Sequence, residues 1–397
     1  MAPTSVSEIL NGIASARVSF DKNEAGSREA LIDYSRSLIS SLEIPSEFLQ
    51  RTFWAEPAQS AIIRLAVNVK LFQHLQAAGD AGLILSALSE KTGIDVVLLQ
   101  RFTRHLVAMN LLTFSDGAIH ATPLSNGLAA ENYQQSICFC YDTSRPSFNN
   151  FPDFFKKTEY KPPAPGGTDG PFQDAHSTQL RFFDWLVATP PNLLHFDSFM
   201  SAYRAGKPDW FDYYPVAERL IEGFDSSNNE ALLVDVGGGR GHDMTTFAKN
   251  FPTRPGKIIL EDREPVIAAV TAANTELDFD VLAHNFFTPQ PIVGARAYSL
   301  HSILHDWGDE DSIKIIENLV PALKKGYSRV LFNEIVLSEE KPTLAATNMD
   351  MMMLAHFAVR ERSEEDWKIL LAKGGLKVVK IYTSPGVAES LIEAELA

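Results

Sequence analysis

The stretch LLVDVGGGRGHDMTTFA, residues 232–248, decides the fold. An apolar run leads directly into Gly237, Gly238, Gly239 and Gly241, and a helical pattern follows. Glycines at such a turn let the backbone bend tightly and approach a ligand with no Cβ in the way. The first N–H groups of the following helix are free to bind ligand oxygens. The stretch therefore predicts a strand, a ligand-binding turn and a helix.

The spacing of this turn differs from the common nucleotide-binding fingerprints. Asp235 precedes the glycines in the order D-x-G-x-G-x-G, whereas a dinucleotide site has G-x-G-x-x-G and a phosphate cradle ends in GK[ST]. A second apolar run, KIILEDREP, ends in Glu261 and Asp262, and a carboxylate there can hold the hydroxyls of a ribose. The turn alone fits NAD, FAD, a nucleotide or S-adenosylmethionine, and these details argue against a standard dinucleotide fingerprint and a complete phosphate cradle.

Short apolar runs recur from about residue 216 to the end of the chain, with helical stretches between most of them. The runs are ALLVDVG, KIILED, DVLAH, ARAYSLHSIL, SRVLFNEIVL and KVVKIY. This alternation is typical of a mostly parallel, doubly wound sheet covered by helices. Residues 216–397 are therefore predicted to form a Rossmann-like α/β catalytic domain that binds the cofactor.

Residues 1–130 have helical periodicity instead. AIIRLAVNVKLFQHLQAAG predicts one amphipathic helix that ends at Gly79, and DVVLLQRFTRHLVAMNLL predicts another that begins after Asp95 as N-cap. LLTFSDGAIHATPL alternates around Asp116-Gly117, which is a hairpin turn signal. Helix, turn, helix and hairpin in this order predict a winged helix.

Residues 131–215 are rich in aromatic side chains, proline and glycine. We interpret this segment as a helical bridge between the two domains. Its aromatic residues, among them Trp185 and Phe196, would suit the walls of a pocket for a flat apolar ligand, although core packing is the more common role of such side chains.

Composition excludes several classes of protein. A chain of 397 residues, 45% of them hydrophobic, is long enough for two cores. The net charge of −15 and the lack of a run of five Lys or Arg argue against nucleic acid and anionic membranes as partners. No apolar run approaches the roughly 20 residues that span a bilayer. Two cysteines and an N-terminus without a secretory pattern favour the cytoplasm.

LHSILHDWGDEDS, residues 300–312, suggests acid–base chemistry. It places His301 and His305 at the end of a strand, where open parallel sheets bind ligands. A neutral imidazole, with an unperturbed pKa of about 6.5, can remove the proton of a phenol during attack. Glu334 and Glu361 follow other apolar runs and could orient the ring. Three unrelated polar groups are the alternative. No carboxylate cluster has metal-ligand spacing, so no metal is expected.

The motifs DVGGGRG, LED, HDW, NE and RERS together resemble those of class I S-adenosylmethionine-dependent O-methyltransferases. The resemblance is to the plant caffeate and flavonoid type and its fungal relatives, and it covers nearly the whole chain. It implies methyl transfer to a hydroxyl of a small aromatic secondary metabolite. It also implies a homodimer formed through the N-terminal domain, with one subunit helping to close the pocket of its partner.

Carried over residue by residue, the resemblance assigns the general base to His305 and its flanking carboxylates to Glu334 and Glu361. Asn285 and Phe286 match the adenine-side pair, where the family usually has an acidic residue before the apolar one. Some family members have Lys in place of His301. The expected cofactor-binding residues are Asp235, Gly237, Gly239, Gly241, Asp262, Asn285, Phe286, His301 and Trp307. The expected substrate-side residues are Trp185, Phe196 and Met200.

Two other functions remain open from the sequence. A fungal protein of this type can bind S-adenosylmethionine and catalyse dehydration or a pericyclic step, for which a complete base trio is not needed. A winged helix can also bind DNA. The candidate recognition segment 81–120 argues against DNA, because its basic and acidic residues balance. These are Lys91, Arg101 and Arg104 against Glu90, Asp95 and Asp116.

Overall fold

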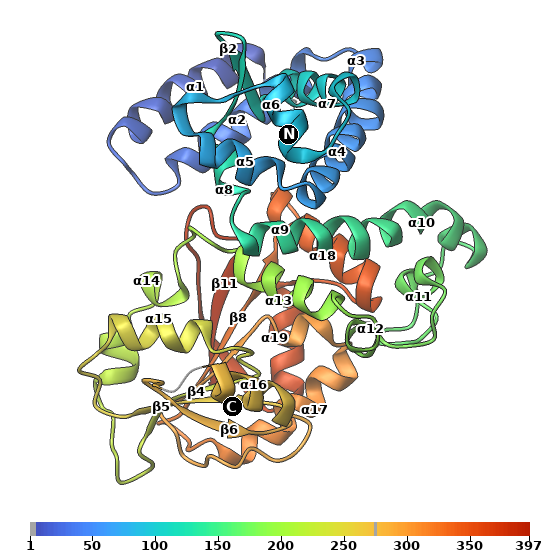
Figure 1. Ribbon diagram of the computed structural model, residues 1–397. Helices are drawn as coiled ribbons and strands as arrows, with labels where there is room; N and C mark the ends of the chain where they lie inside the picture. Colours follow the sequence, from blue (N-terminus) through green and yellow to red (C-terminus); the bar gives the residue numbers. More distant parts are fainter. Residues whose placement is uncertain (1–4, 274–275) are drawn as a thin grey trace. The chain divides into compact units, whose positions relative to one another are not determined.

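The computed structural model describes residues 5–273 and 276–397 (Figure 1). The chain forms two compact units. The first comprises Met1–Pro152 and Ala175–Ala205, and the second comprises Asp153–Asp174 and Gly206–Ala397. The segment 131–215, expected as a bridge, is thus divided between the two units. No helix in the described ranges combines the length and the apolar character that crossing a bilayer requires.

The first unit is mostly helical and has one small antiparallel sheet of order β1-β3-β2. Its strands are β1 (Leu83–Ile84), β2 (Leu112–Ser115) and β3 (Ala118–Ala121). Its helices are α1 (Val6–Asp21), α2 (Ser27–Leu42), α3 (Pro45–Gln50), η1 (Arg51–Ala55), α4 (Glu56–Asn68), α5 (Leu71–Ala78), η2 (Gly79–Ala81), α6 (Leu85–Thr92), α7 (Val96–Ala108), α8 (Pro123–Gly127), α9 (Glu131–Cys138), η3 (Phe139–Ser144), α12 (Phe182–Ala188) and α13 (Asn192–Ala202). Along the chain, α10 (Arg145–Lys157) and α11 (Pro171–His176) continue from one unit into the other.

Local signals in the first unit are confirmed at α7 and at the hairpin. The Asp95 carboxylate accepts from the backbone N–H of Val97 at 2.9 Å, as an N-cap does. β2 and β3 pair around Asp116-Gly117. The prediction of one helix over 61–79 is wrong, because Lys70 has a left-handed φ of 52° and separates α4 from α5. Helical periodicity continues through this break, so the apolar pattern gives no sign of it.

The second unit is built on an eight-stranded sheet with the order β10-β11-β8-β7-β4-β5-β6, and β9 pairs with β8 off this path. The strands are β4 (Ala231–Val236), β5 (Lys257–Asp262), β6 (Asp280–Ala283), β7 (Ala297–His301), β8 (Arg329–Leu337), β9 (Arg362–Ser363), β10 (Leu376–Tyr382) and β11 (Glu389–Leu396). Strands β4 to β8 are parallel, and β11 is antiparallel to both of its neighbours. The predicted Rossmann-like α/β sheet is therefore confirmed.

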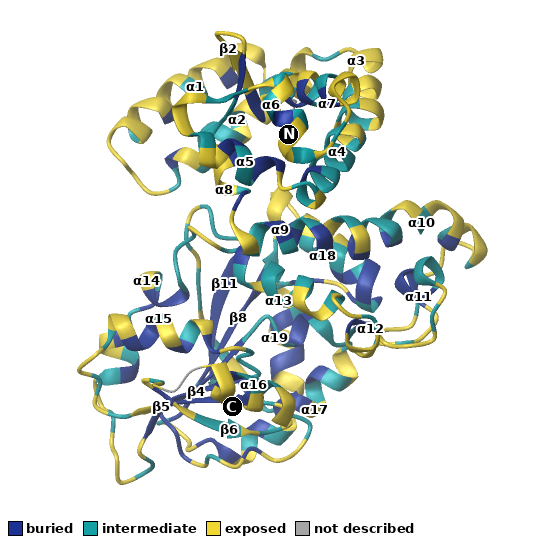
Figure 2. Cartoon of the chain, viewed as in Figure 1, coloured by how far each residue is buried: buried dark blue, intermediate teal, exposed yellow. Residues whose placement is uncertain are grey.

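Helices cover both faces of this sheet, and its central strands are buried (Figure 2). α17 (Asp309–Leu319) and α19 (Glu364–Lys373) pack on one face, whereas α14 (Trp210–Tyr213), α15 (His242–Asn250) and α16 (Glu264–Ala273) pack on the other. The remaining helices are η4 (Ala217–Ile221), η5 (Leu304–Asp306), η6 (Val320–Ala322) and α18 (Leu344–Phe357). This arrangement brings the ends of β4, β5 and β7 together at one edge, where His305 and the predicted cofactor-binding residues lie.

Candidate active site

The glycine turn after β4 requires glycine for two separate reasons. Gly237, Gly239 and Gly241 have φ values of 76°, 59° and 75°, which side chains rarely adopt. Gly238 has no room, since a Cβ there would overlap Asp235 and lie 2.5 Å from Leu260 Cδ1. The N–H groups of Gly237 and Gly238 donate to the Glu261 carbonyl at 2.8 and 3.1 Å. The turn is therefore fixed against the end of β5.

Two carboxylates lie at this turn. Asp262 accepts from the N–H of Gly239 at 2.9 Å and of Arg263 at 2.7 Å. Asp235 is buried and accepts from Ser299 Oγ at 3.0 Å through Oδ1. Its Oδ2 has no hydrogen-bond partner among the described residues, and burial raises the pKa of this carboxyl well above its usual value. A buried polar atom of this kind needs a hydrogen-bond partner, so the turn fits a ligand with polar groups.

The aromatic residues predicted for adenine lie beside the same turn. A Cβ on Gly237 would come within 3.5 Å of the Phe286 ring. The ring centroids of Phe286 and Trp307 are 6.1 Å apart at a steep angle. The Asn285 side chain accepts from the N–H of Phe287 at 3.1 Å and so closes a local turn. The structure therefore brings Gly237, Phe286 and Trp307 together, with Asn285 at their edge.

His301 lies at the end of β7, and its Nδ1 is 2.6 Å from Asp243 Oδ2. Asp243 stands in the first turn of α15, directly after the glycines. Sequence reasoning missed Asp243, although an acidic residue in the first turn of the helix was a visible signal. The pair places a polar group of β7 at the glycine turn.

His305 lies in the short 3₁₀ turn η5, after Ser302 turns the chain away from β7 with a left-handed φ of 53°. The imidazole is buried, and its Nδ1 is 2.9 Å from Glu361 Oε1. On the other side of the ring, Nε2 is 3.5 Å from Asp306 Oδ1. Sequence reasoning missed Asp306, although it is the middle residue of the quoted HDW motif. The ring is thus held at one nitrogen and faces a second carboxylate at the other.

Burial and charge act in opposite directions on His305. Burial by itself lowers the pKa of the imidazole, but the carboxylates of Asp306, Glu361 and Glu334 raise it to about 10. Burial raises the pKa of Asp306 and that of Glu334 to about 7 each. The three carboxylates therefore favour the imidazolium, and a cation bound beside them would favour the neutral ring that a general base requires.

Glu334 and Glu361 hold different parts of the base. Glu334 Oε1 accepts from the N–H groups of Ile303 and Leu304 at 3.0 and 2.8 Å, so it binds the backbone before His305. Glu361 binds the ring itself, and its own N–H donates to Asp350 Oδ1 at 2.8 Å. Glu334 and Glu361 were both expected to contact the ring of His305. Among the described contacts, Glu361 binds the ring, whereas Glu334 binds the backbone.

The predicted substrate-side residues lie in the first unit. Phe196 of α13 belongs to an aromatic cluster, with ring centroids 5.5 Å from Phe139 and 5.8 Å from Phe182. Trp185 of α12 packs instead on His176 at 4.7 Å, and Met200 is exposed. The role of all three in binding a substrate stays a prediction.

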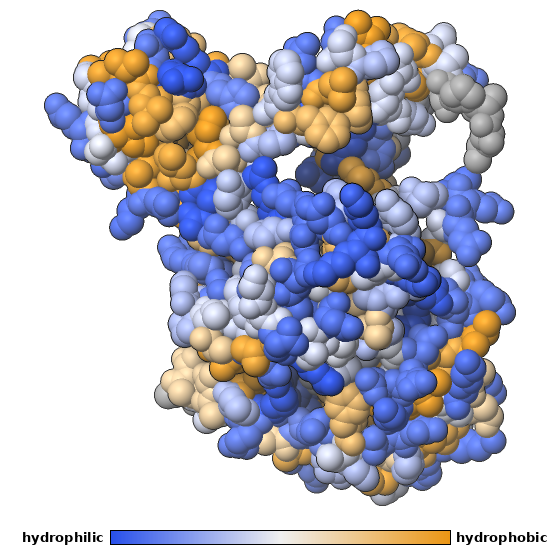
Figure 3. Space-filling model, turned by 90° about the vertical axis from the view of Figure 1, so that its right-hand side faces the viewer, coloured by the Kyte–Doolittle hydropathy of each residue, from blue (hydrophilic) through white to orange (hydrophobic). Residues whose placement is uncertain are grey.

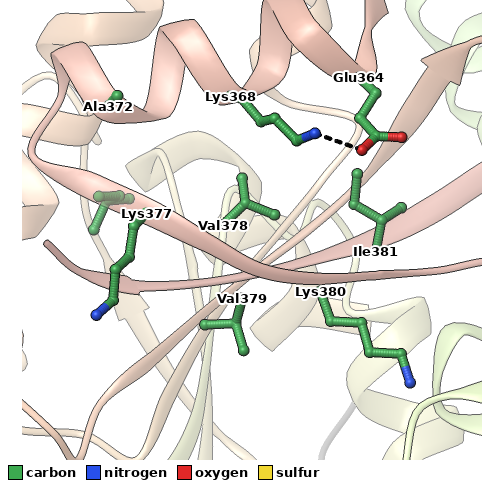
Figure 4. A pocket seen from close by; sticks show the side chains of 9 residues that line it. Glu364, Lys368, Ala372, Lys377, Val378, Val379, Lys380 and Ile381 are labelled. Atoms are coloured by element: carbon green, nitrogen blue, oxygen red, sulfur yellow. Dashed lines mark ion pairs between the residues drawn. The ribbon is translucent and has the colours of Figure 1, made fainter.

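A surface pocket of about 490 Å³ lies away from these residues, between α19 and the edge strand β10 (Figure 4). Lys368, Lys377 and Lys380 line it, and Lys368 forms an ion pair with Glu364 at 2.7 Å. None of its lining residues belongs to the predicted site, so its size does not make it the active site.

Comparison with known proteins identifies the family of the chain. The O-methyltransferase domain model matches residues 211–377. The O-methyltransferase mpaG of Penicillium roqueforti (strain FM164) is 61% identical over 100% of both chains. The solved structure of LepI in complex with S-adenosylmethionine has a TM-score of 0.89 and 26% identity, and a structure described as a pericyclic reaction enzyme has 0.89 and 25%. Each alignment covers 99% of this chain and 100% of the other. By its full-length similarity, the chain belongs to the family of S-adenosylmethionine-dependent O-methyltransferases.

Proposed function

We propose that the enzyme methylates a hydroxyl of a small aromatic secondary metabolite and that His305 is its general base. The observation that carries this proposal is the 2.9 Å contact between His305 Nδ1 and Glu361 Oε1. A carboxylate at Nδ1 accepts the proton there and leaves the lone pair on Nε2, which can then take the proton of a hydroxyl. S-adenosylmethionine supplies an electrophilic methyl group on a positively charged sulfur.

Residues of the chain itself take up the proton of the substrate hydroxyl. Nε2 of His305 accepts it as the substrate oxygen attacks, and Glu361, Asp306 and Glu334 stabilise the resulting imidazolium. These are the carboxylates that raise the pKa of the ring to about 10. A positioned base of this kind contributes roughly 10² to 10⁴-fold to the rate, and the alignment of the reactants contributes much of the rest.

We also propose roles for the residues at the glycine turn. Asp262 binds the ribose hydroxyls, because its carboxylate still has lone pairs beyond the two N–H groups it accepts. Gly237, Gly239, Gly241 and Asp235 form the cradle, and Asp235 Oδ2 pairs with a polar group of the ligand. Phe286 and Trp307 pack on adenine, Asn285 meets its edge, and His301 contacts the cofactor with Asp243 behind it. On the substrate side, we propose Trp185, Phe196 and Met200.

The first test is His305→Gln, which keeps a polar side chain of similar size. Turnover should fall roughly 10² to 10⁴-fold because the base is lost. Affinity for S-adenosylhomocysteine, measured by calorimetry, should stay within about twofold of the wild type, since no proton transfer is involved in binding. Wild-type turnover in this variant would show that the base assignment is wrong.

The reaction type needs a separate experiment, because a structure described as a pericyclic reaction enzyme is 25% identical to this chain. The purified enzyme is incubated with labelled S-adenosylmethionine and a panel of phenolic natural products. A product heavier by one labelled methyl, formed in step with S-adenosylhomocysteine, establishes methyl transfer. A changed carbon skeleton without methyl gain establishes the alternative. The ring contact of Glu361 favours methyl transfer, since a pericyclic step needs no general base.

We further propose that the first unit is a winged-helix dimerisation domain that pairs with a second copy of the chain. Large apolar side chains of its first helices are exposed, among them Phe48, Phe53 and Trp54. Figure 3 shows apolar side chains gathered on the surface of this unit. Exposed apolar surface of this extent marks an interaction site. The double variant Phe53→Ser, Trp54→Ser should sediment as a monomer, whereas Val293→Ser, at an exposed position of the second unit, should sediment as the wild-type dimer.

A further inference from the structure

The turn that carries His305 is held through its carbonyl groups by one arginine. Arg362 Nη1 donates to the carbonyl of Leu304 at 2.8 Å, and Nη2 donates to the carbonyl of Trp307 at 2.8 Å. These two carbonyls lie on either side of His305 in the chain. Glu334 binds N–H groups of the same turn. The backbone around His305 is therefore bound at its N–H groups by the carboxylate of Glu334 and at its carbonyl groups by the guanidinium of Arg362.

Arg362 is itself fixed from several directions. It is 2% exposed, and both its Nε and Nη2 donate to Asp309 Oδ1, at 3.0 and 2.9 Å. Its guanidinium lies over the ring of Trp367, 5.2 Å from the centroid. Its backbone pairs with Val336 in the register of β9 on β8. The guanidinium thus ties the turn to the same strand that supplies Glu334.

We propose that Arg362 is a positioning residue that sets the direction of His305 Nε2. The inference rests on the proposed role of His305 as the base. Ser302 enters this turn with a strained φ of 53°, and such backbone persists only where its surroundings hold it. Arg362 directly follows Glu361 in the chain, so one short segment orients both the ring and the backbone of the base. A shift of about 1 Å in a reacting group can cost roughly 10²-fold in rate.

The guanidinium suits this task better than an ammonium would. Its N–H donors point outward in a fixed fork, so two nitrogens reach two carbonyls at once. A lysine has three donors on a single atom and cannot span Leu304 and Trp307 while also meeting Asp309. Arg362→Lys therefore keeps the positive charge and removes the paired hydrogen bonds to Leu304 and Trp307. The variant thus distinguishes the effect of positioning from the effect of charge.

The matched control is Arg296, a second buried arginine that binds backbone carbonyls. Its guanidinium donates to the carbonyl of Tyr327 at 2.7 Å and to that of Arg219 at 2.8 Å. Neither carbonyl belongs to the turn of His305. Arg296→Lys thus measures how the loss of a buried arginine that binds carbonyl groups affects folding, while the contacts of His305 stay unchanged.

The experiment follows the imidazole proton shared by His305 Nδ1 and Glu361, a far-downfield NMR resonance assigned by its loss in His305→Gln. It needs no substrate. In Arg362→Lys we expect this resonance to shift or broaden and turnover to fall roughly 10 to 10²-fold, with affinity for S-adenosylhomocysteine unchanged. In Arg296→Lys the resonance should stay in place even if the melting temperature falls.

The outcomes separate this inference from the proposed function. If Arg362→Lys keeps both the resonance and wild-type turnover, Arg362 does not position the base. If it instead loses only stability, as Arg296→Lys does, with the resonance unmoved, its role is structural and the inference is also wrong. If His305→Gln keeps wild-type turnover, the failure belongs to the base assignment. Arg362→Met, which is isosteric at the stem, serves where the lysine variant does not fold.

Discussion

Glu361 determines which nitrogen of His305 carries the proton, because its Oε1 lies 2.9 Å from Nδ1. In Glu361→Gln the side-chain amide can donate to Nδ1 and so favour the tautomer with the proton on Nε2. That nitrogen could no longer accept the proton of the substrate. We expect turnover to fall by up to roughly 10⁴-fold, as for a triad carboxylate replaced by its amide. Glu361→Asp keeps an acceptor and should retain more activity than Glu361→Gln in the same assay.

Sequence reasoning at the residue scale identified which groups gather but not what each one touches. His305, Glu334 and Glu361 were expected as a trio, and the structure brings them together. Their distinct contacts depend on the conformation of η5, where Glu334 meets the N–H groups of Ile303 and Leu304. Arg362 and Asp350 act through backbone atoms as well. Backbone contacts leave no pattern in the side-chain sequence, so these partners could not be predicted.

At the scale of elements, the break between α4 and α5 leads to a prediction about stability. Lys70 is exposed and has a φ of 52°, which costs a residue with a Cβ roughly 1–2 kcal/mol relative to glycine. Glycine loses more backbone entropy on folding, which offsets part of this gain. Lys70→Gly should therefore raise the free energy of unfolding by about 0.5–1 kcal/mol, measured by urea denaturation. Lys70→Ala keeps the Cβ and should show no such gain.

The strands show why some elements are visible in a sequence and others are not. β4, β5, β7 and β8 are buried on both faces and appear as continuous apolar runs. β11 was not predicted, because ESLIEAEL carries several glutamates. Its Glu393 is buried and accepts from Arg219 Nε at 3.0 Å. The sequence does not show that Arg219 pairs with Glu393, so a glutamate in this position is predicted to lie on the surface.

At the scale of the whole molecule, the buried charges around His305 link activity to stability. The pKa of about 10 for His305 exceeds its ordinary value of 6.5, so the folded protein holds a proton that the unfolded chain releases between these pH values. The stabilisation that this group supplies is complete below about pH 6.5 and is lost as the pH rises through 10. Burial raises the pKa of Glu334 and Asp306 to about 7, so the stability that these two groups supply is present at low pH and is lost as the pH rises through about 7.

The wild type should therefore lose stability relative to His305→Gln as the pH rises from 6.5 toward 10. Glutamine does not titrate, and the difference between the two proteins cancels the ionisable groups that do not interact with His305. Asp306 and Glu334 do not cancel, because the imidazolium lowers their pKa in the wild type only. Urea denaturation of both proteins, without cofactor, at several pH values in this interval provides the measurement. A difference in unfolding free energy that stays constant across the interval would mean that the carboxylates around the ring do not hold its proton. In that case, the imidazole is neutral before the substrate arrives, and the three acids act on its position alone.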